Sequence, residues 1–100
     1  MSATIKKMFT EEQLNLIRDE ANKLAKVLLE KDVSKIFKED GGNANYVLNV
    51  SVFFVAGIIS IISKKITVNP IYLSKLFMDQ VEECIKTRND PVKHILSLVH

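Results

Sequence analysis

The sequence predicts an all-α protein, folded as a compact bundle of four to five helices. Two features favour this class: apolar residues recur at spacings of three and four, and residues typical of helix starts precede them. One hundred residues is the size of one domain, and such a chain can bury one core without disulfides. We therefore expect one helical domain over residues 9–100, preceded by a flexible N-terminus at 1–8.

The first expected helix covers residues 11–30. Thr10 stands at the cap position and Gln13 follows three residues later, which is the spacing of a capping box. The apolar residues that follow are three or four apart and share one helical face: Leu14, Ile17, Ala21, Leu24 and Leu28. This pattern predicts an amphipathic helix whose apolar face packs on the rest of the domain.

A second, short helix is predicted at 33–39. Asp32 can cap its start. Gly41 and Gly42 can end it, because glycine readily adopts the left-handed conformation found at helix ends.

Two residue pairs, Asn69-Pro70 and Asp90-Pro91, are typical of helix starts and predict two helices in the C-terminal third of the chain. Asn69 and Pro70 supply a cap and a first helical residue, and the apolar face that follows comprises Leu73, Leu76, Phe77, Val81, Cys84 and Ile85. Asp90 and Pro91 repeat the signal, and the apolar face of this last helix comprises Val92, Ile95, Leu96 and Val99. These two helices complete the expected bundle.

The central segment, residues 46–62, carries no charge and is rich in valine and isoleucine. Its composition allows a β-hairpin over 46–68, which would make the fold α+β. Ala56-Gly57 is a poor two-residue turn, however, since the first position also needs a positive φ. We therefore expect a helix, with the hairpin as the alternative.

Such an apolar helix suits the centre of a bundle, where amphipathic helices cover it. Seventeen residues reach only about 25 Å, short of the roughly 30 Å of a bilayer's hydrocarbon core. A buried helix in a cytoplasmic protein is therefore the expectation, and a small single-span membrane protein is an alternative.

The sequence offers no constellation typical of catalysis, a metal or a cofactor. His94 and His100 are six residues apart, a spacing that places them on different sides of a helix. The single cysteine, Cys84, cannot form an internal disulfide. No glycine-rich phosphate loop is present. We predict a non-enzymatic protein without cofactor.

One stretch, from Ile59 to Phe77, carries a motif-like run: Pro70, Tyr72, Leu73, Ser74, Lys75, Leu76 and Phe77. It resembles the helix-turn-helix of the arabinose-regulator class of transcription activators. The resemblance implies a DNA-binding regulator in which Ile71, Ser74 and Lys75 face the major groove. The net charge of +2 is too small to indicate nucleic-acid binding by itself.

We therefore predict that the protein acts by binding another protein, as a regulator, adaptor, inhibitor or immunity factor. Leu16, Tyr72 and Met78 lie off the apolar faces of their helices, and leftover apolar surface is typical of an interface. A homodimer is one form that such an interface can take. Lysine far outnumbers arginine, which suggests an AT-rich gene of phage or plasmid origin.

Overall fold

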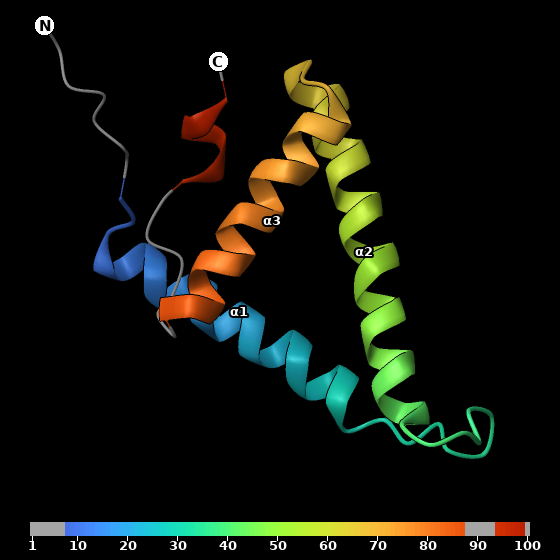
Figure 1. The fold of residues 1–100 in the computed structure, drawn as a ribbon. Helices are drawn as coiled ribbons and strands as arrows, with labels where there is room; N and C mark the ends of the chain where they lie inside the picture. The colour runs from blue at the N-terminus through green and yellow to red at the C-terminus, as the bar shows by residue number, and fades with distance from the viewer. Residues whose placement is uncertain (1–7, 88–93, 100) are drawn as a thin grey trace, which may run out of the picture.

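The computed structural model describes residues 8–87 and 94–99. In these ranges the chain forms three α-helices and one short 3-10 helix, and no strand. The elements are α1 (Glu11–Leu29), α2 (Gly42–Ile66), α3 (Pro70–Thr87) and η1 (Ile95–Leu98). The all-α class is confirmed, and the alternative hairpin over 46–68 is wrong because α2 runs through it (Figure 1).

The start of α1 has the capping box that its sequence predicts. The Thr10 hydroxyl oxygen accepts a hydrogen bond from the Gln13 backbone N–H at 3.1 Å, and the Gln13 side-chain oxygen accepts one from the Thr10 N–H at 2.9 Å. The predicted start of α3 also forms, because the Asn69 side-chain oxygen accepts from the Ile71 N–H at 2.8 Å. Local signals thus determine where both helices begin.

Helix α2 has 25 residues and is longer than the 46–62 expected from its apolar run. Its inner polar side chains bond to its own backbone: Asn49 donates to the Asn45 carbonyl, and Ser51 donates to the Val47 carbonyl, both at 2.8 Å. These bonds satisfy polar groups without a break in the helix. At about 37 Å, α2 is long enough to cross a hydrocarbon core, so the argument from length against a membrane span is wrong.

The second helix expected at 33–39 is a single turn instead. The Val33 carbonyl accepts from the backbone N–H groups of Ile36 and Phe37, both at 2.9 Å, and no further helical turn follows. Ile36 is 79% exposed, so packing does not stabilise this segment, and seven residues alone are too few for a stable helix. Gly41, expected to end this helix, has a φ of 75° and precedes α2.

The last expected helix is also shorter than predicted. The described part of it is η1, and the predicted start at Asp90 and Pro91 lies outside the described residues. A bundle of four to five helices is therefore not what the described chain forms.

The three α-helices lie like the sides of a triangle rather than side by side (Figure 1). α2 and α3 meet at the short turn that joins them and diverge from there, and α1 lies across the open end. The radius of gyration is 16.2 Å, whereas a compact domain of this length has about 13 Å. The accessible surface is 8224 Å², against about 5,700 Å² for a folded monomer of this mass.

The core is correspondingly small. Among the described residues, only Val33, Ile59 and Leu73 are buried apolar side chains, and α1 buries no residue at all. Ile59 and Leu73 lie where α2 meets α3, and Val33 lies in the turn before α2. The helices are well formed locally but bury little apolar surface against one another.

Candidate functional site: an apolar trough between the helices

One concave feature of the described chain is an apolar trough along the inner side of α2. One part, of about 430 Å³, lies between α1 and α2, and a second, of about 310 Å³, lies between α2, α3 and η1. Phe54 and Val55 line both parts, so the two hollows adjoin each other along α2. We define the apolar trough by these apolar residues: Leu24, Val27, Leu28, Val50, Phe54, Val55, Ile58, Ile59, Ile62, Leu73, Phe77, Ile95 and Leu96.

The trough follows from the helix patterns. Leu24 and Leu28 belong to the apolar face of α1, and Leu73 and Phe77 belong to that of α3. Because the helices diverge, these faces point toward a shared space without filling it. Val27 remains 75% exposed and Phe54 53% exposed, although both line the trough.

Charge is nearly absent from this surface. Of the described residues that line the two hollows, Lys31 is the one charged side chain, and it lies in the part between α1 and α2. Tyr46 and Ser51 add the polar atoms there, and the part next to α3 is lined by apolar residues throughout. The trough therefore suits an apolar occupant.

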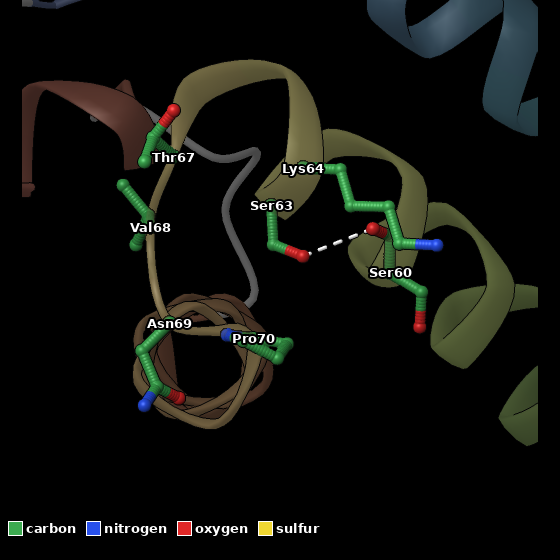
Figure 2. A pocket seen from close by; sticks show the side chains of 7 residues that line it. All are labelled: Ser60, Ser63, Lys64, Thr67, Val68, Asn69 and Pro70. Carbon is green, nitrogen blue, oxygen red and sulfur yellow. Dashed lines mark hydrogen bonds between the residues drawn. The ribbon is translucent and has the colours of Figure 1, made fainter.

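A second hollow lies at the α2–α3 turn (Figure 2). Its polar groups are used within the turn: the Ser63 hydroxyl donates to the Ser60 carbonyl at 2.9 Å, and Ser60 donates in turn to the Ala56 carbonyl at 2.8 Å. Thr67 ends α2 with a φ of 55°, and the Val68 N–H donates to the Ser63 carbonyl at 3.0 Å. These contacts form the C-terminal stop of α2.

The partner-binding residues predicted from the sequence, Leu16, Tyr72 and Met78, are all exposed. They lie on α1 and α3, and none of them lines the trough. Leu24, Leu28, Leu73 and Phe77 were expected to pack in a core, because periodicity shows which face of a helix is apolar and not whether another element covers it. The signal that could have identified the trough is the uncharged run at 46–62, which has more apolar surface than two neighbouring helices can cover.

The residues predicted for DNA binding lie in the first two turns of α3. Ile71 and Lys75 are exposed, whereas Ser74 is half-buried and its hydroxyl donates to the Ile71 carbonyl at 2.7 Å. Further along the same helix, Glu82 and Lys86 form an ion pair at 3.0 Å. Two of the three side chains are thus accessible, and the third is engaged with its own backbone.

No group of three or more potential metal ligands occurs within 8–87 and 94–99. Comparison of the chain with protein-family models, curated proteins and solved structures finds no match. The resemblance of Ile59–Phe77 to the arabinose-regulator class therefore depends on those residues alone.

Proposed function

We propose that this protein acts by contact, binding an apolar helical segment of a protein partner in the apolar trough. The observation that carries the proposal is the exposure of apolar side chains that line a concave, nearly uncharged surface on three helices. A helix fits such a site because it can lay one apolar face along α2 while its other faces stay in water. The role is that of a non-enzymatic regulator, adaptor, inhibitor or immunity factor in the cytoplasm.

A protein partner explains the exposed surface better than a lipid bilayer does. If α2 crossed a membrane, α3 would enter the hydrocarbon with it, because α3 turns back from the end of α2 (Figure 1). α3 carries the exposed residues Asp79, Glu82 and Glu83. A charged residue near the bilayer centre costs about 3 kcal/mol on insertion scales. The single-span alternative thus requires α3 to separate from α2.

Site-specific photo-crosslinking in cells tests the proposal. A photoreactive phenylalanine analogue at Phe54 is expected to give a discrete protein adduct that persists after nuclease treatment. The same analogue at Lys35, an exposed residue outside the trough, is the matched control and is expected to give none. Adducts to lipid alone at Phe54, or no protein adduct there, would contradict the proposal.

DNA binding is the second candidate, favoured by the short turn at 67–69. Three residues join α2 to α3, as in helix-turn-helix motifs, and Lys75 is exposed on the second of these helices. If this candidate holds, the protein is retained on duplex DNA at low ionic strength and Lys75→Glu abolishes the retention. Absence of salt-sensitive retention for the unmodified protein excludes it.

A further inference from the structure

We propose that the occupant of the apolar trough is a second copy of this chain. The inference rests on the proposed function and specifies the partner. In the dimer, α2 of each copy would pack in the apolar trough of the other copy, so that the open sides of the two molecules cover each other. A two-fold dimer is the commonest closed arrangement for a self-complementary surface.

The exposed area is large enough for a permanent dimer. The chain exposes about 2,500 Å² more than a folded monomer of its mass. A standard interface takes about 800 Å² from each partner, and permanent homodimers take about 1,000 to 2,500 Å². This excess counts the polar and apolar surface of the whole chain, and a part of it the size of a standard interface would be enough for a dimer.

The small core points in the same direction. The described part of the monomer has a small hydrophobic core, since its buried apolar side chains are Val33, Ile59 and Leu73. Permanent homodimer interfaces resemble a domain core cut in two. Such a chain needs its partner while it folds, and a second copy of the same chain is always available in equal amount.

One line of residues on α2 gives the interface a self-complementary centre. Val50, Phe54 and Ile58 are four residues apart and form a ridge along α2, and all three line the trough and are exposed. Ridges of this spacing pack into one another when two helices cross at about −50°. A crossing at Phe54 would place the ridge of each copy in the trough of the other.

The charge of the trough is compatible with pairing of identical surfaces. A two-fold axis brings like charges close together wherever a charged residue lies near it. Lys31 is the one charged residue among those that line the two hollows, and it lines the part between α1 and α2 together with Phe54, whereas the part next to α3 has no charged residue. Two copies can therefore meet over the part next to α3 without electrostatic repulsion.

Sedimentation equilibrium of the full chain in detergent-free buffer tests the inference. The expected mass at micromolar concentration is twice 11.3 kDa, that is 22.6 kDa. Phe54→Glu is expected to raise the dissociation constant by at least about 100-fold, because it places a charge at the centre of the interface. Val52→Glu is the matched control: Val52 lies on α2, is 64% exposed and lines neither part of the trough.

A second measurement keeps the test valid if Phe54→Glu fails to fold. In a Cys84→Ser background, Phe54→Cys is expected to form a disulfide between two chains under mild oxidation, and Val52→Cys is not. A folded wild-type monomer that gives an adduct with another protein at Phe54 would overturn the dimer and leave the proposed function standing. A folded monomer without any adduct, or a protein that needs lipid to stay soluble, would overturn both. A dimer in which Phe54→Cys does not crosslink would overturn the trough as its interface.

Discussion

The side chain of Asn43 holds Val33 against the start of α2. Its amide oxygen accepts a hydrogen bond from the Val33 N–H at 3.0 Å, and its amide nitrogen donates to the Asp32 carboxylate at 3.4 Å. The rings of Phe37 and Tyr46 lie 5.7 Å apart and pack across the same junction. These contacts fix the direction in which the chain leaves α1 and enters α2, and so they shape one end of the apolar trough.

Asn43→Ala is expected to destabilise the protein by about 1 to 2 kcal/mol, because it leaves the half-buried Val33 N–H without its acceptor. Asn45→Ala is the matched control, since the Asn45 side chain is exposed in the same part of α2, and it is expected to change stability by less than about 0.5 kcal/mol. Urea denaturation at equal protein concentrations measures both, because association makes stability depend on concentration. Equal effects would show that Asn43 does not fix this junction.

The carboxylate of Asp32 gives this junction a dependence on pH. Its backbone hydrogen bond from Ser34, and a further side-chain bond from Asn43, lower the pKa of Asp32 below its ordinary value of 3.8. Because the pKa is lower in the folded state than in the unfolded state, the contribution of Asp32 to stability is present above that ordinary value. The contribution is lost as the pH falls through the folded-state pKa.

Asp32→Asn is therefore expected to reduce the loss of stability between pH 6 and pH 3. The measurement is the urea midpoint at the two pH values for the wild type and the variant. The other carboxylates affect both proteins alike, so they cancel in the comparison. An identical pH dependence for the wild type and Asp32→Asn would contradict the prediction.

Two glycines of α2 are expected to respond in opposite ways to alanine. A Cβ at Gly42 would collide with the Phe37 backbone carbonyl, whereas a Cβ at Gly57 meets nothing within 4 Å. Gly42→Ala should destabilise the protein by about 1 to 3 kcal/mol, because the backbone of the preceding turn must move. Gly57→Ala should stabilise it by about 0.5 to 1 kcal/mol, since alanine favours a helix over glycine. Thermal unfolding of both variants checks the difference in sign, and a loss of stability in both would contradict it.

Local structure could be predicted from this sequence, and the contacts between helices could not. The starts at Thr10 and Asn69 depend on residues within one turn, and both form as predicted. The helix expected at 33–39 stops after one turn because nothing covers Ile36, and the contact that holds this segment comes from Asn43, ten residues away from Val33. Leu24 and Phe77 were assigned to the correct apolar faces but not to the trough. The spacing of apolar residues along a helix shows its apolar face, but it does not show how far that face lies from the next helix.

The last prediction concerns Thr67, which ends α2 with a φ of 55°. A β-branched residue in this left-handed conformation is strained, whereas glycine adopts it freely and asparagine tolerates it. Thr67→Gly is therefore expected to stabilise the protein by about 1 kcal/mol, and Thr67→Asn by less.

Thr87→Gly is the control, because Thr87 lies in the last turn of α3 and its φ is not positive. That variant should gain nothing, since it also loses the hydrogen bond that the Thr87 hydroxyl donates to the Glu83 carbonyl at 2.8 Å. Urea denaturation of the four proteins gives the order. If Thr67→Gly is less stable than the wild type, the turn at 67–69 does not hold Thr67 in this conformation in solution. The conformation of Thr67 would then not explain the angle between α2 and α3 that opens the trough.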